Sequence, residues 1–566
     1  MSTLLPKAVS FPHLFIVFSR ILFQTFSHTF FVNTLSQNIT KNLTKLKKLL
    51  PSEDVFHYVF ETADKVTCAL VYADGLVNKQ LLGDLIARPL SKLNLSAQTE
   101  KTPEAEQGVP SKKAKNDGGR ALTNTNSASQ SEENTPPDSP DGQEERLKTI
   151  RRAALFPELK EKRNFDETVK EILDGNVALL IDGIAVILIV GAKFLPVRTI
   201  MEPPTDVVIK GPREGFIEDI KVNMSLVRKR LKAPELTFET MKIGRRTDTS
   251  VVLCYLDGIV NEQVKQDVQA RLKKIDVDCI LDSSYISAFI SPHGHSVFKQ
   301  IGTTEKPDVF AGKIAEGRVG ILVDGSPIAL TVPFVLTEDF QSSEDYFISP
   351  FSATIFRALR FIALVVALLL PALYVSAQLF KMQLVPLGLM LTIVSSTREL
   401  PLSPSLEMFV VLLLLEILKE ASIRMPKYVG MSLSVVGALV LGETAVNAGI
   451  LSTPAIIVVA FSGICLYTVP NFVETGSILR WFFLIVGGSL GPFGIVLSLA
   501  FLLYYLLSTD SFNAPLLAPF CPFSPKDMRD SLVKYGAQSL TKRPALFGSP
   551  NRTRANIQRI DKEQKS

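Results

Sequence analysis

The chain has 566 residues, a formal net charge of +5 and 46% hydrophobic residues. This length allows several domains, and the small positive charge comes without a basic patch carrying aromatic platforms, which excludes the usual signature of nucleic-acid binding. The five cysteines are widely scattered, with no CxxC or Cys/His spacing, so we expect reduced thiols facing a cytoplasm and no zinc site.

The first 48 residues are treated as an N-terminal extension. Leu14–Phe23 is apolar, but Arg20 interrupts it and no A-x-A-like cleavage site follows, which argues against a secretory signal. Two interpretations remain open: an amphipathic helix that touches a membrane, or an extension without a structural role. A further possibility is that the native start lies downstream, near Asn33–Lys48.

A repeat organises the next part of the chain, where folded sequence is expected from about Ser52. Tyr72–Gln80 (YADGLVNKQ) and Tyr255–Gln263 (YLDGIVNEQ) share six residue types at matched offsets. Asn176–Val190 and Arg318–Val332 each place two strand-like runs around an Asp-Gly pair, the pattern of a β-hairpin. These matches predict two related α/β subdomains in tandem, and the Asp-Gly pairs are interpreted as turns rather than as metal or phosphate sites.

The first copy of the repeat is interrupted by an insertion, Ser96–Glu145. It is rich in Ser, Thr, Asn, Pro, Glu and Lys and poor in large apolar side chains, so it cannot bury enough surface to offset its ordering entropy. We therefore expect this insertion to be disordered. Leu147–Phe156 and Phe165–Leu173 then read as helices that lead back into the fold.

A glycine-bearing loop and an amphipathic helix join the two copies. The loop could bind an anion at the start of the helix, but it lacks the GK[ST] ending of a P-loop and its proline removes one amide donor. A packing turn is therefore preferred. His293-Gly-His295 could hold a metal, but with no third ligand nearby a surface loop is preferred. The residues of the connecting loop are Gly211, Pro212, Arg213, Glu214, Gly215 and Phe216.

The last third of the chain is predicted to cross a membrane several times. Phe361–Ser376 follows Arg357 and Arg360, as expected where a helix enters from the cytoplasmic side. Leu384–Val394 is too short to cross alone and suggests a re-entrant or broken element. Ile478–Leu507 would be about 45 Å long as one helix, and Gly487–Pro492 is the predicted break point if it instead forms two half-spans. The basic tail should stay inside, so the number of crossings is even, and four or six both remain open.

Charged residues within these apolar segments predict a polar membrane interior. A charge near the membrane centre costs roughly 2.5–3.5 kcal/mol, so such side chains should face protein, water or one another. Within Pro401–Pro426, carboxylates and an arginine recur every four residues and would form one stripe on a helix. The candidate polar interior residues are Glu407, Glu416, Lys419, Glu420, Arg424, Glu443 and Asn447.

The following helix is expected to carry a face of small residues. Gly430, Ser434, Ala438 and Gly442 recur every four residues, which lets helix backbones approach closely where lipid supplies no hydrophobic drive. We predict that this face packs helices or subunits together.

These patterns predict an α/β soluble region of two tandem related subdomains plus a C-terminal α-helical multi-pass transmembrane domain. The expected parts are an extension at 1–48, a first α/β subdomain at 49–200 with a disordered insertion at 96–145, a connecting helix and second α/β subdomain at 201–348, a transmembrane helical domain at 349–508 and a basic cytoplasmic tail at 509–566.

Six long stretches in order resemble the GerA family of bacterial spore germination proteins, and more specifically the A subunits of nutrient germinant receptors. The resemblance covers roughly Leu43–Lys542, and Lys306 stands where the family commonly has Arg. The stretches are EPPTDVVIKGPREGFIEDIKVNMSLVRKRLKAPEL (202–236), KIGRRTDTSVVLCYLDG (242–258), TEKPD (304–308), GRVGILVDGSP (317–327), EILKEASIRMP (416–426) and SFNAPLLAPFCP (511–522).

The resemblance implies a multi-pass protein of the spore inner membrane with its large N-terminal region facing the core. It implies as partners a transporter-like membrane B subunit, a lipoprotein C subunit and further copies of the chain. Such a complex would respond to a small-molecule nutrient, with the A subunit as an oligomeric ligand-gated cation channel. No cofactor, metal or enzymatic activity is expected, since no nucleophile–base pair or metal set is present. A signalling scaffold without conduction and a secondary transporter are the alternatives.

Overall fold

The computed structural model describes residues 35–93, 146–151, 159–194, 206, 208–398, 400–426, 429 and 440–554. The chain divides into two compact units, Met1–Thr199 with Met224–Phe238, and Ile200–Asn223 with Glu239–Ser566. The expected disordered insertion and the apolar run at the start of the chain lie outside the described residues.

The first unit is built on a five-stranded antiparallel sheet of order β1-β2-β4-β5-β3. Its strands are β1 (Val55–Glu61), β2 (Thr67–Ala73), β3 (Leu159–Lys162), β4 (Val177–Ile181) and β5 (Ile187–Val190). Its helices are α2 (Ile39–Leu49), α3 (Lys79–Leu82), α4 (Arg88–Ser91) and α6 (Phe165–Leu173), with a π-helical turn, Gly83–Ala87, joining α3 to α4.

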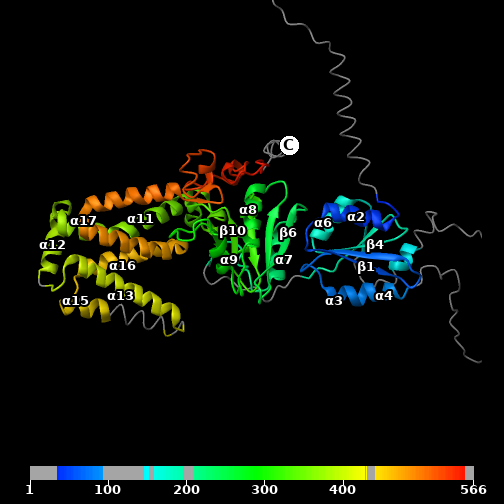
Figure 1. Cartoon of the computed structure of the whole chain (residues 1–566), viewed down its shortest axis with the longest axis horizontal. Coiled ribbons are helices and arrows are strands. Elements are labelled where there is room, and N and C mark those ends of the chain that lie inside the picture. Colours follow the sequence, from blue (N-terminus) through cyan, green and yellow to red (C-terminus); the bar gives the residue numbers. More distant parts are fainter. Residues whose placement is uncertain are drawn as a thin grey trace, which may run out of the picture. The chain divides into compact units, whose positions relative to one another are not determined.

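Helices cover both faces of this sheet, because successive strand residues point to opposite sides. Leu70 lies in a core with the α3–α4 segment, whereas its neighbour Val71 lies in a core with α2 and α6 (Figure 1). The predicted helix Phe165–Leu173 is confirmed as α6, with Asn164 capping its first turn. Of the predicted helix Leu147–Phe156, only 146–151 lies within the described residues, and it is helical.

The expectation that residues 1–48 form an extension outside the fold was wrong for their last part. Ile39–Leu49 is a helix capped by Asn38, and Leu46 is completely buried against the sheet. The sequence analysis missed this helix because lysine and threonine dominate it, and only its three or four core-facing residues are apolar.

The second sheet repeats the first, with order β6-β7-β9-β10-β8. Its strands are β6 (Leu236–Ile243), β7 (Thr249–Leu256), β8 (Gly302–Thr304), β9 (Val319–Val323) and β10 (Ala329–Val332). Its helices are α8 (Glu262–Lys273), α9 (Ser283–Ile290) and α10 (Pro307–Ala315), and α7 (Ile220–Arg230) is divided between the two units at Met224. A Cβ at Gly320 on β9 would lie 2.2 Å from the buried Phe310 ring. Because glycine has no Cβ, α10 can pack tightly on this face.

The four Asp-Gly pairs are turns in both copies. Gly75 and Gly258 have φ of +76° and +74°, and Gly183 and Gly325 both have +83°, a region that favours glycine. After the first pair in each copy, Asn78 and Asn261 cap the next helix through their side-chain oxygens. The matched residues of the repeat are thus explained by turn and cap geometry, without any ligand.

A helical bundle follows the second sheet within the same unit. It contains α11 (Pro350–Phe380), α12 (Leu387–Thr397), α13 (Pro404–Arg424), a π-helical turn (Val440–Thr444), α15 (Ala445–Asn447), α16 (Thr453–Tyr467) and α17 (Val473–Ser508). Among the described residues, Pro350–Phe380 and Pro470–Ser508 are the segments long and apolar enough to cross a membrane, and α12 and α16 are shorter apolar helices.

The break predicted at Gly487–Pro492 is present, and it reverses the chain direction. Gly491 has φ +67° and ψ −154°, outside the helical region, and Pro492 follows it. Thr475 donates a hydrogen bond to the Val297 carbonyl at 2.8 Å, and Tyr505 donates one to Ser296 at 3.0 Å. A straight helix would hold residues 475 and 505 about 45 Å apart, so α17 must be a hairpin of two arms (Figure 1).

Both ends of the bundle therefore lie on the side of the second sheet. After α17, Asp510 lies 3.1 Å from His293, and Ser511 binds the Gln300 carbonyl and the Phe334 amide. Residues 510–554, which were expected to be a basic tail, instead form a folded segment. Ser549 donates to the Ile259 carbonyl at 2.7 Å, and Arg543 donates to the Ala315 carbonyl at 2.7 Å.

Candidate functional site

Helix α13 carries the predicted polar stripe, and local sequence signals fix its ends. Ser403 accepts a hydrogen bond from the Leu406 amide, Pro404 occupies the first turn, and the helix ends at Arg424, two residues before Pro426. Its 21 residues span about 32 Å, which matches the roughly 30 Å of bilayer hydrocarbon. Glu416 lies near the middle of this length.

Glu416 is paired inside the bundle with an arginine that the sequence analysis did not select. Arg480 on α17 is 1% exposed and places its Nη2 atom 2.7 Å from the Glu416 carboxylate. Lys419, one turn along α13, pairs with the same carboxylate and donates to Ser477 at 3.2 Å. The other guanidinium nitrogen of Arg480 approaches Ser462 on α16 at 3.4 Å.

This arrangement joins four helices through polar groups. Ser462 donates to the Ala367 carbonyl of α11 at 2.8 Å, so α11, α13, α16 and α17 all contribute. A buried charge left without its partner is strongly destabilising, so Arg480 and Glu416 depend on each other. The one signal for Arg480 in the sequence was its position inside the apolar run Ile478–Leu507.

The remaining charges of α13 separate into two environments. Glu407 is 1% exposed and accepts a hydrogen bond from the Ser452 amide at the start of α16. Glu420 and Arg424 pair with each other one turn apart and are 57% and 76% exposed. The predicted stripe is therefore divided: Glu416 faces the bundle, and the Glu420–Arg424 pair lies on the surface of the single chain.

The other predicted membrane residues lie partly outside the described chain. Gly430, Ser434 and Ala438 lie outside the described residues. Gly442 is described, and a Cβ added there would meet no atom within 4 Å. The side chains of Glu443 and Asn447 are exposed.

The connecting loop Gly211–Phe216 makes packing contacts. Gly211 has φ +125°, and a Cβ there would lie 2.8 Å from the Phe347 ring. Phe216 is buried, donates its amide to the Glu305 carbonyl at 2.7 Å, and packs edge-to-face on Phe310 with ring centroids 5.6 Å apart. Between them, Pro212, Arg213, Glu214 and Gly215 complete the turn before α7.

No metal site is found among the described residues, which contain no group of three or more His, Cys, Asp or Glu side chains suitably placed to hold an ion.

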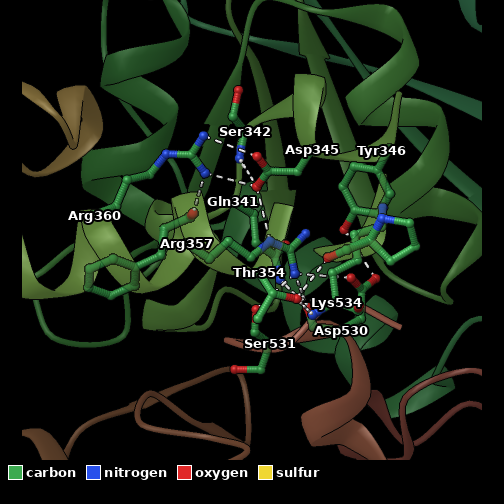
Figure 2. A network of polar contacts seen from close by, with 12 residues as sticks. Gln341, Ser342, Asp345, Tyr346, Thr354, Arg357, Arg360, Asp530, Ser531 and Lys534 are labelled. Carbon is green, nitrogen blue, oxygen red and sulfur yellow. Dashed lines mark hydrogen bonds and ion pairs between the residues drawn. The ribbon is translucent and has the colours of Figure 1, made fainter. Parts of the chain in front are cut away.

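A buried network links the start of α11 to the segment before it and to the C-terminal segment (Figure 2). Arg357 is completely buried, and its Nε atom lies 3.0 Å from Asp345. Arg357 also donates to the main-chain carbonyls of Asp530 and Ser531 at 2.9 and 2.8 Å. Arg360 binds both oxygens of Asp345, at 2.8 and 3.0 Å.

Arg357 and Arg360 were expected only to mark the cytoplasmic entry of a helix. They also hold Asp345, and the hydrogen bonds of Arg357 to main-chain carbonyls bring in residues more than 170 positions downstream. Lys534 from that segment lies over the Tyr346 ring at 3.4 Å. Burial lowers the pKa of the Lys534 ammonium to about 8.

A cavity of about 800 Å³ lies beside this network, within the same unit. Its walls come from the second sheet and α10, the short turns before α11, the α16–α17 connection and the C-terminal segment. Charged side chains of both signs line it. They are Asp206, Lys299, Glu305, Asp308, Lys313, Glu316, Arg318, Glu338, Asp339, Arg360, Glu474 and Arg554.

Comparison with known proteins identifies the family. The profile described as Bacillus/Clostridium GerA spore germination protein matches residues 41–546. The chain is 32% identical over 525 residues to spore germination protein KA of Bacillus subtilis (strain 168), covering 92% of this chain and 88% of that protein. It is 34% identical over 421 residues to spore germination protein GerQA of Bacillus cereus, covering 74% and 84%.

A solved structure is also similar, the N-terminal domain of the A subunit of the Bacillus megaterium spore germinant receptor GerK3. It is 27% identical, with a TM-score of 0.36, and covers 53% of this chain and 95% of that one. From the family match and the relatives, this chain belongs to the GerA family of spore germination proteins.

Proposed function

We propose that this chain is the A subunit of a nutrient germinant receptor in the spore inner membrane and that it oligomerises into a ligand-gated cation channel. The relatives named as spore germination proteins support the receptor role. The charged residues of α13 support conduction, and the Glu420–Arg424 pair carries this part of the proposal.

Glu420 and Arg424 are exposed at the end of a Leu-rich helix; Arg424 closes the helix at the membrane boundary, whereas Glu420, about 6 Å further in, would be costly if it faced hydrocarbon. Their mutual ion pair does not remove this cost, because both side chains remain largely accessible. Further copies of the chain would keep both charges out of lipid if this face of α13 lined a polar path shared by the copies. Such a ring is the arrangement that we propose for the conducting state.

We infer six membrane passages with both soluble parts on the core side. Both ends of the bundle lie on the side of the second sheet, which requires an even number. The described part supplies α11, α13, α16 and the two arms of α17. The even number then requires one further passage. This topology agrees with the positive residues expected on the inner side.

A transporter-like B subunit and a lipoprotein C subunit are the proposed partners, with lipid around the bundle and a small-molecule nutrient as the trigger of the complex. The small-residue face of Gly430, Ser434, Ala438 and Gly442 would pack against a neighbouring helix or copy. The open space around Gly442 in the single chain is compatible with such a neighbour.

Ion flux from liposomes containing the purified full-length protein tests conduction. We expect monovalent cation flux from the oligomer, and a reduced flux in Glu420→Gln. Glu262→Gln, an exposed carboxylate on α8 of the soluble part, is the matched control and should leave flux unchanged. Absence of flux from every oligomeric state would count against a channel.

A signalling scaffold is the second candidate, and the network around Arg357 favours it. This network ties α11, the segment before it and the C-terminal segment together, so movement of one part would reach the others (Figure 2). If the oligomer carries no ions while Asp345→Asn still blocks germination at normal protein levels, the scaffold is the correct interpretation.

A further inference from the structure

Only some of the charged side chains that line the cavity beside the second sheet form ion pairs within the described part of the protein. Lys313 lies 2.7 Å from Glu338, and Arg318 pairs with both Glu338 and Glu316. Arg360 is held by Asp345 outside the cavity lining. These contacts satisfy three of the basic side chains, so they leave the cavity with an excess of acidic groups.

Asp339 is the deepest of the acidic groups that remain. It lines the cavity, is 9% exposed, and has no hydrogen bond or ion pair among the described residues. Asp308, also in the lining, has a buried carboxylate oxygen without a hydrogen-bond partner. An unsatisfied buried carboxylate is costly, and the cost is relieved when a donor, above all a cationic one, binds it.

The surroundings of Asp339 change the protonation of its carboxyl group. Burial raises its pKa to about 7, opposed by the positive charge of Lys299 and reinforced by the negative charge of Glu338. Lys313 opposes the rise as well. Lys299 makes no ion pair among the described residues, so Asp339 lacks a direct counter-charge and exchanges its proton near neutral pH.

We propose that this cavity binds a small molecule carrying a primary ammonium group, which Asp339 holds through a charge-assisted hydrogen bond. A metal ion is not favoured, because the described residues provide no cluster of three ligands. The volume of about 800 Å³ accepts a small organic molecule. Lys299, a basic side chain in the same lining, can meet a carboxylate on that molecule.

Occupation of this cavity would connect the soluble and helical parts of the unit. Asp339 belongs to the 3₁₀ turn Leu336–Phe340 before α11, whereas Asn471 and Glu474 in the same lining belong to the start of α17. A ligand that contacts both would favour one arrangement of these elements, which is how binding energy shifts a conformational equilibrium. Binding itself does not depend on whether the chain conducts ions.

Isothermal titration calorimetry on the full-length protein in detergent tests this proposal. The probes are 1,4-diaminobutane, 4-aminobutanoate, butanoate and potassium chloride. We expect both amines to bind and butanoate and potassium chloride not to bind. Tighter binding of 4-aminobutanoate than of the diamine identifies an amino acid-like ligand that also uses Lys299, and the reverse order identifies a free amine.

The site variant is Asp339→Asn, and Asp278→Asn, an exposed carboxylate in the same unit, is the control. We expect Asp339→Asn to weaken amine binding at least tenfold and the control to have no effect. The affinity of the wild type should rise about tenfold from pH 6 to pH 8, because only the ionised fraction of Asp339 binds. This pH dependence should vanish in the variant.

Thermal unfolding at pH 8 separates loss of binding from loss of folding, since Asp339→Asn removes an unpaired buried charge and should melt no lower than the wild type. No binding of either amine, equal binding by Asp339→Asn, or binding of potassium chloride with the same affinity as the amines would overturn the proposal.

Discussion

Gly491 decides whether α17 is one long helix or a hairpin, and its replacement gives the sharpest test of the bundle. Its φ of +67° and ψ of −154° lie in a region that only glycine adopts readily, so a side chain costs about 1–3 kcal/mol in backbone strain. A Cβ would also lie 2.8 Å from the Phe380 ring, and relieving this overlap costs about 1–3 kcal/mol more. Gly491→Ala should therefore destabilise the bundle by roughly 2–6 kcal/mol.

Spin labels at Ile478 and Leu503, both on exposed faces of α17, measure the geometry directly. In a continuous helix these positions would lie about 37 Å apart. In the hairpin they lie on adjacent arms, because Thr475 and Tyr505 both bind the segment at Ser296 and Val297. We expect a short interspin distance in the wild type, and a lower melting temperature with longer distances in Gly491→Ala.

Gly388→Ala on α12 is the matched control, because its new Cβ meets no atom within 4 Å and should cost no stability. A wild-type distance near 37 Å would refute the hairpin. A Gly491→Ala variant that melts at the wild-type temperature would refute the strain argument even if the hairpin is correct.

Three further predictions concern buried groups. Glu416→Gln leaves the buried Arg480 without its counter-charge and should lower the free energy of unfolding by about 3–5 kcal/mol. Adding Arg480→Leu should recover much of the lost melting temperature. Equal melting temperatures of the single and double variants would contradict the pairing. Leu46→Ala should cost about 2–5 kcal/mol in thermal unfolding, because α2 belongs to the core, and an unchanged melting temperature would place α2 outside the fold. For Asp339, the native pKa of about 7 exceeds the unfolded value of about 3.9, so the bound proton stabilises the native state below pH 7 and this stability is lost as pH rises. The loss between pH 4 and pH 7 should be about 3 kcal/mol and be absent in Asp339→Asn, and parallel pH profiles of melting temperature would contradict it.

Local sequence was sufficient where a structure depends on neighbouring residues. The Asp-Gly turns and helix α6 follow from short-range geometry, and both occur as the pattern indicates. The caps at Asn78 and Asn261 are equally local, although the repeat was noted without predicting them. The internal repeat was visible for the same reason, because turn and cap residues are repeated at fixed offsets. The order of the strands, however, required the structure, since pairing joins segments that the insertion separates.

Only the tertiary structure decided which charges meet. Glu416 finds Arg480 64 residues away, and Arg357 finds Asp530 173 residues away. No spacing rule connects such positions, because the bundle and the C-terminal segment bring them together only after the chain has folded. The sequence by itself indicated that carboxylates within apolar segments need protein or water around them. Folding determined that Glu416 obtains an internal partner while Glu420 and Arg424 stay on the surface, where a second copy of the chain can reach them.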